Sequence, residues 1–414
     1  MGLWIFFLAA MLVLGGCNAQ SPESGLFQNV QETSRETGMW SLFSDHLQEA
    51  PKDVSSGEVL GDLVNYDHFF LEEGNHYCYN TLTLAERIWY EDMENILGSL
   101  AEKGELSQEG IVQGLTENDI DHIFQCVMMD HPEFFFVDGY VYGVSRMGEK
   151  LIKLEFSGSY HTTREEAVQK KQQIEQAAER IVLNCPQASD DYEKIKYVYE
   201  TLILETEYDP DAPDNQNIYS VFVGKKSVCQ GYAKATQYLL NQLGVECTLV
   251  SGMVQGGNRH GWNLVRSDGE YYFVDTTWGD ASYKLTEEKQ YMEMPEINYD
   301  YLCVTSDELS RTHYLDESIE VPSCVSIRDN YYVREGAYFT ELDQTQLRAL
   351  FEKTSEEQSY RVTLKCADFD VYEQMKRLLL EEGNVFQYYQ APVSGVVYVK
   401  NDEQYSLTFW VTNS

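Results

Sequence analysis

The segment most informative about the fold is Val228-Cys229-Gln230-Gly231-Tyr232-Ala233. The residues after it form an apolar stripe at helical spacing that ends at Gly244, namely Ala233, Thr236, Leu239, Leu240 and Leu243. The pattern therefore predicts that Cys229 lies in the first turn of a helix. Unpaired backbone N–H groups and the positive end of the helix dipole favour a thiolate there, and the thiolate is the nucleophilic form of cysteine.

A thiolate nucleophile needs a proton partner, and the nearby candidate is His260. It begins an apolar run that reverses at Asp268-Gly269 and returns through residues 270–278. If these two residues are the centre of a hairpin turn, facing positions sum to 537 (268 + 269). Trp262 then faces Asp275, and His260 faces Thr277. Asp275 would lie diagonally from His260 on the same face of the sheet, within reach of the imidazole. A three-residue turn would break this parity.

Three segments carry a family resemblance: V-C-Q-G-Y-A at 228–233, H-G-W-N at 260–263 and V-D-T-T-W at 274–278. In order and spacing they resemble the signature blocks of the transglutaminase-like superfamily, which shares the papain-like cysteine-protease core. The residues 301–309 and His313 are also similar to the segment that follows this core in bacterial members. The resemblance covers about residues 160–315.

The resemblance implies an α+β fold in which a helix-borne cysteine packs on an antiparallel sheet. It also implies three roles: Cys229 is the nucleophile, His260 the general base and acid, and Asp275 the residue that orients the imidazole. An acid in that place fixes the imidazole tautomer and raises the basicity of the other ring nitrogen.

The residues around this triad have less specific expectations. The backbone N–H of Cys229 is one candidate oxyanion donor, and Tyr219 or Gln230 is a candidate for the second. Trp262 and Trp278 are expected to pack around the site or to line its groove.

The predicted reaction is acyl transfer at a peptide or carboxamide carbonyl through a thioester. Hydrolysis by water and transfer to an amine both stay open, because loops shape the groove that selects the acceptor. The rival hypothesis is a catalytically silent, surface-anchored binding or scaffold protein with the same fold.

A second chemical candidate, a metal site at His131, is weaker. His131 stands beside acids in Asp130-His131-Pro132-Glu133, but this segment places no third or fourth donor at a recognisable spacing. No calcium loop of the EF-hand type is present in the sequence either. The sequence therefore predicts no metal and no cofactor.

The N-terminal residues suggest export. The uncharged apolar stretch from Trp4 to Leu14 is too short to span a membrane and has the length of a signal-peptide core. Leu14-Gly15-Gly16-Cys17 resembles the lipobox of bacterial lipoproteins, in which the cysteine is acylated. We therefore expect a signal peptide over 1–16, lipidation of Cys17, a polar tether over 17–59, and anchoring to the extracytoplasmic face of a bacterial membrane.

Composition limits the remaining possibilities. The 414 residues include 68 Asp and Glu against 30 Lys and Arg, a net charge of −38, and 43% hydrophobic residues, enough to build cores. This charge disfavours nucleic acid, so the expected partner is a protein or peptide substrate, including one associated with the cell wall. Nine cysteines without C-x-x-C spacing do not make a disulfide scaffold. One is expected to be lipidated, one to be the nucleophile, and seven to be bystanders.

The chain outside the tether divides into three predicted regions: an accessory region over 60–153, the catalytic domain over 154–315, and a small α+β layer over 325–414. In the accessory region, residues 134–142 predict strand, turn and strand about Asp138-Gly139. In the catalytic domain, Thr162 and Glu165 have capping-box spacing ahead of a helix. In the C-terminal layer the pattern predicts strand (331–333), helix (344–351), strand (360–366), helix (371–380) and a hairpin (396–411).

Overall fold

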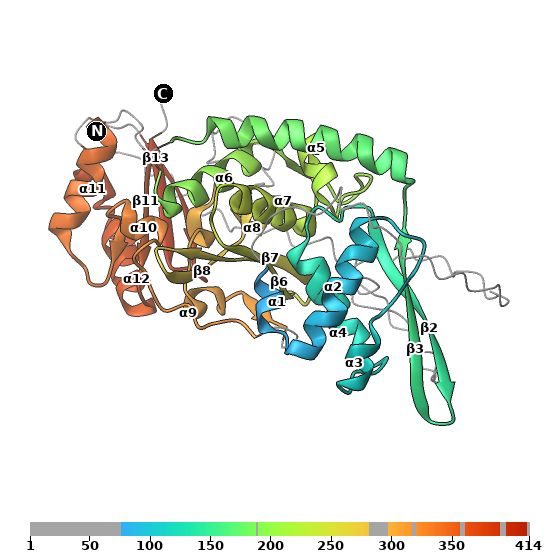
Figure 1. Ribbon diagram of the computed structural model, residues 1–414. Helices are drawn as coiled ribbons and strands as arrows, with labels where there is room; N and C mark the ends of the chain where they lie inside the picture. The colour runs from blue at the N-terminus through green and yellow to red at the C-terminus, as the bar shows by residue number, and fades with distance from the viewer. Residues whose placement is uncertain are drawn as a thin grey trace, which may run out of the picture.

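The computed structural model describes residues 76–187, 189–280, 297–316, 320–356, 361–389 and 395–411. The predicted signal peptide, Cys17 and the tether lie outside the described residues. Within these ranges, no helix combines the length and the apolar character needed to cross a bilayer. Figure 1 shows the accessory and C-terminal regions at opposite ends of a central region.

The accessory region is a small helical layer followed by a long hairpin. Its elements are α1 (Tyr77–Thr81), α2 (Leu84–Gly98), β1 (Gly104–Glu105), α3 (Gln108–Val112), α4 (Ile120–Asp130), β2 (Val137–Met147) and β3 (Lys150–Tyr160). The strands form one sheet in the order β1-β3-β2. The β2–β3 hairpin projects from the body of the molecule (Figure 1).

The predicted turn at Asp138-Gly139 is wrong. Both residues lie inside β2, where the register with β3 shifts between Val137 and Gly139. The chain reverses later, at Gly148, whose φ of +65° suits a tight turn. An Asp-Gly pair accommodates a bulge as well as a turn, and here the bulge prevails.

The central region consists of helices packed on a four-stranded sheet. Its helices are α5 (Arg164–Asn184), α6 (Asp191–Glu205), η2 (Ser220–Gly224), α7 (Cys229–Gln242), α8 (Thr276–Gly279), η4 (Tyr299–Tyr301) and α9 (Ser306–Leu309). Its strands are β4 (Glu207–Tyr208), β5 (Lys226–Ser227), β6 (Cys247–Val254), β7 (Arg259–Ser267), β8 (Glu270–Val274) and β9 (His313–Leu315). The sheet has the order β8-β7-β6-β9, with antiparallel pairing throughout. The α+β prediction is confirmed.

The capping box of α5 lies one residue later than predicted. Thr163 is the N-cap, and its side chain and that of Glu166 exchange hydrogen bonds with each other's backbone N–H groups. Thr162, the predicted cap, instead donates its hydroxyl to Glu166 Oε2 at 2.9 Å. The next helix, α6, begins after Asp190, which caps it in the same way.

The C-terminal region is a small α+β layer, as predicted. Its elements are α10 (Tyr331–Arg334), β10 (Tyr338–Phe339), α11 (Gln344–Glu356), β11 (Arg361–Cys366), α12 (Phe369–Lys376), η5 (Arg377–Glu381), α13 (Val385–Tyr388), β12 (Val396–Asn401) and β13 (Ser406–Val411). The sheet order is β10-β11-β13-β12. The predicted strand at 331–333 is wrong, because Asn330 caps a short helix there through the backbone N–H of Tyr332.

Three hydrophobic cores hold the described regions, and the smallest lies around Trp262 and Phe273 on the central sheet. The C-terminal layer has its own core between its helices and its sheet. The accessory and central regions share one core, which runs from Cys78 to Cys303. Gln237 in α7 also donates to the carbonyl of Met129 in α4 at 2.7 Å. The accessory region therefore packs directly on the helix that carries Cys229.

Candidate active site

Cys229 lies in the first turn of α7, as predicted. Its N-cap, Val228, contributes no capping side chain, so the N–H groups of this turn have no side-chain partner at the cap. Gly231 lets the turn approach the preceding loop: a Cβ atom there would overlap Ser227 Oγ and lie 3.0 Å from the Asn215 carbonyl oxygen. Cys229 is half-buried, whereas the other seven described cysteines are buried free thiols.

The β7–β8 hairpin has the predicted register. Asn263 faces Val274, so facing positions sum to 537. The turn residues Asp268 and Gly269 have φ angles of +47° and +87°, as a two-residue turn of this type requires. The strand, however, ends at Val274 and not at residue 278.

Asp275 ends the strand because its side chain caps the next helix. Its Oδ1 accepts the Trp278 backbone N–H at 3.0 Å, and α8 follows. The predicted cross-strand pairs of Trp262 with Asp275 and His260 with Thr277 are therefore wrong. The predicted proximity of Asp275 and His260 is nevertheless observed.

His260 connects the acid to the thiol. Its Nε2 donates to Asp275 Oδ2 at 2.6 Å. The imidazole also interacts with the Cys229 side chain, and because Nε2 is bonded to Asp275, Nδ1 is the ring nitrogen left for the sulfur. The backbone N–H of Gly261 is a further hydrogen-bond donor to Cys229.

These contacts set the protonation states of the site. Burial raises the pKa of the Cys229 thiol, but His260 and the Gly261 N–H together hold this pKa below its usual value. Burial lowers the pKa of His260, but Asp275 and Cys229 raise it to about 10. Both shifts favour the thiolate–imidazolium pair over the neutral thiol and imidazole.

A second histidine, to which the sequence assigns no role, supports the acid. His313 in β9 donates its Nε2–H to the same Asp275 Oδ2 at 2.9 Å. Burial lowers the pKa of His313, which keeps its ring neutral. Asp275 thus accepts from two imidazoles, and although burial raises its pKa, His260 and His313 hold the pKa below its usual value.

The line of hydrogen bonds extends from His313 into the C-terminal layer. Because its Nε2 carries the proton, its Nδ1 accepts from the Thr312 hydroxyl, at 2.8 Å. Thr312 Oγ1 accepts in turn from Gln404 Nε2 at 3.4 Å. Gln404 is almost fully buried and also donates to the Glu308 carbonyl at 3.1 Å. Through Gln404, the C-terminal layer therefore contacts the residues that hold Asp275 in place, namely Thr312 and His313.

Trp262 and Trp278 enclose the imidazoles, as expected of residues that pack around the site. The Trp262 ring is fully buried and stacks on His260, with a centroid separation of 5.9 Å. Trp278 is half-buried, and its ring lies 6.1 Å from His260 and 4.7 Å from His313. Both rings exclude water from the Asp275 side of the site.

The two candidates for the second oxyanion donor differ in position. Gln230 follows Cys229 in the first turn of α7 and is buried, and its Oε1 makes no hydrogen bond within the described part of the chain. The Tyr219 hydroxyl donates to Gln173 in α5 at 2.9 Å, and Lys170 lies over its ring.

Comparisons with known proteins agree with this architecture. Residues 175–276 match the family model of the transglutaminase-like superfamily. The kyphoscoliosis peptidase of Mus musculus is 25% identical over 119 residues, which cover 25% of this chain and 18% of that protein. The Homo sapiens protein of the same name is 26% identical over 111 residues, covering 23% and 17%. The chain thus spans less than a fifth of the length of these relatives.

Two solved structures also align with parts of the chain. A TGase structure aligns with a TM-score of 0.26 and 16% identity, covering 38% of this chain and 50% of that chain. A chain described as a cysteine protease from Cytophaga hutchinsonii aligns with a TM-score of 0.24 and 10% identity, covering 33% and 61%.

The family match covers α7 and the strands β6, β7 and β8, including Cys229, His260 and Asp275. The helix-borne cysteine and three of the four strands on which it packs lie within the match, whereas β9 lies outside it. Residues 175–276 therefore resemble the transglutaminase-like superfamily, and the helices and antiparallel sheet around them are consistent with an α+β papain-like core.

Proposed function

We propose that the protein is a cysteine acyl-transfer enzyme that acts on peptide or carboxamide bonds. The observation that supports this most is the placement of His260 between Cys229 and Asp275, where it interacts with the thiol and donates to the carboxylate at 2.6 Å. A nucleophile, a base and a group that orients the base are the three parts that such chemistry needs.

In the proposed reaction, the Cys229 thiolate attacks the carbonyl carbon and forms a tetrahedral intermediate. The imidazolium of His260 gives its Nδ1 proton to the departing amine, the C–N bond breaks, and a thioester forms. Water or a second amine then attacks the thioester and gives a proton to His260, and the C–S bond breaks to restore the thiolate. Water yields a peptidase or amidase, and an amine yields a cross-linker.

The oxyanion of the tetrahedral intermediate needs two donors. The proposed first donor is the backbone N–H of Cys229 at the start of α7. For the second we favour Gln230 over Tyr219, because Gln230 is buried in the same turn and the Tyr219 hydroxyl is bonded to Gln173.

We expect iodoacetamide at pH 6 to alkylate Cys229 about tenfold faster in the wild type than in His260→Gln. An ordinary thiol with a pKa near 8.5 is less than about 1% thiolate at this pH, and the lower intrinsic nucleophilicity of an acidic thiol offsets part of the gain. Peptide mass spectrometry on the intact chain identifies the cysteine and its rate. As pH falls from 8 to 6, the rate should fall steeply in the variant and much less in the wild type.

His122→Gln is the matched control, since His122 is exposed on α4. In this variant, iodoacetamide should alkylate Cys229 at the wild-type rate. If wild-type Cys229 reacts no faster than in His260→Gln at pH 6, the thiol is not activated and the silent scaffold becomes the better explanation.

We further propose that the protein is exported and lipid-anchored through Cys17. The support is the lipobox-like Leu14-Gly15-Gly16-Cys17 behind an apolar stretch. Cells fed an alkyne fatty acid should incorporate label into the wild type and not into Cys17→Ser. An unlabelled wild-type protein would contradict the anchor.

A further inference from the structure

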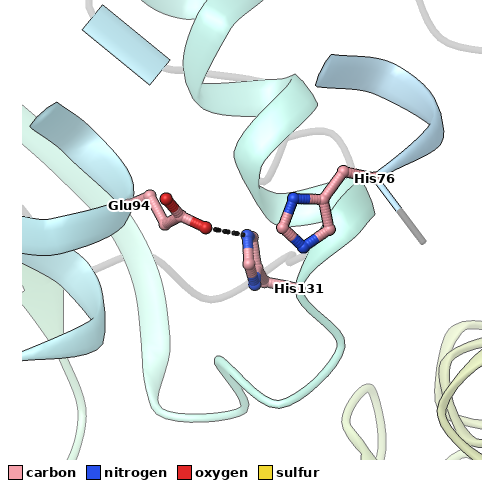
Figure 2. Close-up of side chains that lie close together, drawn as sticks. All are labelled: His76, Glu94 and His131. Atoms are coloured by element: carbon pink, nitrogen blue, oxygen red, sulfur yellow. Dashed lines mark ion pairs between the residues drawn. The ribbon is translucent and has the colours of Figure 1, made fainter. Parts of the chain in front are cut away.

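A second cluster of chemically capable side chains lies in the accessory region, outside the proposed triad. His76 precedes α1, Glu94 lies in α2, and His131 follows the last residue of α4. Figure 2 shows the three side chains pointing toward one another from these three elements. One nitrogen or oxygen atom of each lies within 4.8 Å of the others.

The geometry of His131 Nε2 differs from that of an ordinary hydrogen bond. This nitrogen is buried and pairs with Glu94 Oε1 at 3.0 Å as an ion pair, without meeting the geometry of a hydrogen bond within the described residues. The imidazoles of His260 and His313, in contrast, both form aligned hydrogen bonds to Asp275. His131 Nε2 and Glu94 Oε1 thus form an ion pair (Figure 2), and both atoms are of the kind that binds one metal ion when the imidazole is neutral.

The other ring nitrogen of His131 is held by a carboxylate. His131 Nδ1 lies 2.7 Å from Glu133 Oε1, and the Phe134 ring stacks on the imidazole at a centroid distance of 4.6 Å. A carboxylate on one nitrogen places the proton there and turns the lone pair of the other nitrogen outward, which is the usual support of a metal-binding histidine. The lone pair of Nε2 then faces Glu94 and His76.

A neighbouring carboxylate fixes the third donor. Asp130 is buried and accepts the backbone N–H groups of Cys78 and Tyr79 at 2.9 and 2.8 Å and the Tyr90 hydroxyl at 3.0 Å. It thereby holds the start of α1, and with it His76, beside His131. The two rings lie 4.9 Å apart between centroids.

The distances suit a small divalent ion. Zinc binds imidazole nitrogen and carboxylate oxygen at about 2.0–2.2 Å, which puts neighbouring ligand atoms of a tetrahedron roughly 3.4 Å apart. The separation of 3.0 Å between His131 and Glu94 is close to this value, and His76, which is only half-buried, can move inward. Two imidazoles and a carboxylate are donors that zinc-class ions prefer over Mg²⁺ or Ca²⁺.

We propose that His76, Glu94 and His131 bind a divalent transition-metal ion of the zinc class, with solvent in the fourth position. The ion would link α1, α2 and α4, three elements whose donors are far apart in the sequence. It would therefore cross-link these three elements of the accessory region, which packs on α7.

A proton on His131 is the alternative occupant of this place. Burial lowers the pKa of His131, but Glu133 and Glu94 raise it to about 10. Without an ion, His131 would thus be an imidazolium between two carboxylates.

The test is a Zn²⁺ titration of the full chain, by competition with a chromophoric chelator, in a Cys229→Ala background that removes the thiolate of the triad as a zinc ligand. We expect one Zn²⁺ per chain and a higher Tm when it is bound. His76→Gln and Glu94→Gln should each bind at least about tenfold more weakly, and their Tm should no longer respond. Co²⁺ in place of Zn²⁺ should give a visible d–d band that the same substitutions remove.

His122→Gln is again the matched control, because it removes an exposed imidazole from the same helix, α4, and should leave the affinity unchanged. Neither half-buried His76 nor Glu94 fills a core position, so these variants should fold even if a substitution of buried His131 does not. Equal Zn²⁺ affinity in His76→Gln, Glu94→Gln and His122→Gln would overturn the proposal, as would no Zn²⁺ bound in the Cys229→Ala parent. In that case the proton occupies the cluster.

Discussion

Replacement of Asp275 by Asn should lower acyl transfer by about 10⁴-fold, the loss expected when the base is held in the wrong tautomer. Asp275 Oδ2 accepts from the Nε2–H groups of His260 and His313. An asparagine offers one carbonyl oxygen for these two donors, and its NH₂ group would favour His260 with the proton on Nδ1. That tautomer cannot take a proton from Cys229.

This prediction is measured with casein, both as hydrolysis and as incorporation of a fluorescent primary amine, because the acceptor is open. The alkylation rate of Cys229 against pH should also approach that of an ordinary thiol. Asp268→Asn, in the turn of the same hairpin, is the matched control and should keep full activity, since Asn tolerates its positive φ. More than a tenth of wild-type turnover in Asp275→Asn would refute the assignment.

His313 gives a graded comparison within the same experiment. His313→Gln removes one of the two imidazoles on Asp275 and leaves the contact of His260 in place. We expect a loss of about tenfold, which corresponds to roughly 1.4 kcal/mol, the size of one hydrogen bond to a charged group. His313 would thus be a positioning residue, and its loss should shift the pH dependence of Cys229 labelling less than the loss of Asp275 does.

Replacement of Trp262 by Ala should lower the free energy of unfolding by about 3–5 kcal/mol. The indole is fully buried, stacks on His260 and lies edge-on to His313 at 5.0 Å. Gly252 of β6 is pressed against it, since a Cβ there would lie 2.8 Å from Trp262 Cη2. An alanine would leave a cavity beside both imidazoles that this tight packing cannot close.

Urea denaturation followed by circular dichroism measures this effect. Trp262→Phe keeps an aromatic ring against His260 and should lose less than half as much stability. Equal losses in the two variants would contradict the cavity argument, because Phe restores most of the volume that Ala removes.

The sequence predicts the part of the site that depends on local geometry. The stripe after Cys229 predicts α7, and the alternation about Asp268-Gly269 predicts the register of β7 with β8. The end of β8 is not predictable in this way, because Asp275 suits a strand and a helix cap equally. In the structure Asp275 accepts a hydrogen bond from the Trp278 N–H, so it caps α8 and the strand ends before it.

Contacts made by distant pairing leave no such pattern. His313 reaches Asp275 because β9 pairs with β6, where His313 faces Val254. No spacing in the sequence predicts this pairing. The same holds for His76 and Glu94, which tertiary packing brings to His131. The sequence shows one histidine beside acids and cannot show the two donors that come from other helices.

The contact of Gln404 with Thr312 has a practical consequence for truncation. A fragment trimmed to residues 175–276, the part that the family model matches, would retain Cys229, His260 and Asp275. It would nevertheless leave Asp275 with a single imidazole and expose its other flank to solvent. If such a fragment were inactive, the cause would be the loss of His313 and Gln404, and the result would say nothing about the activity of the intact chain. The shortest fragment suitable for an activity measurement therefore extends through β13, which ends at Val411.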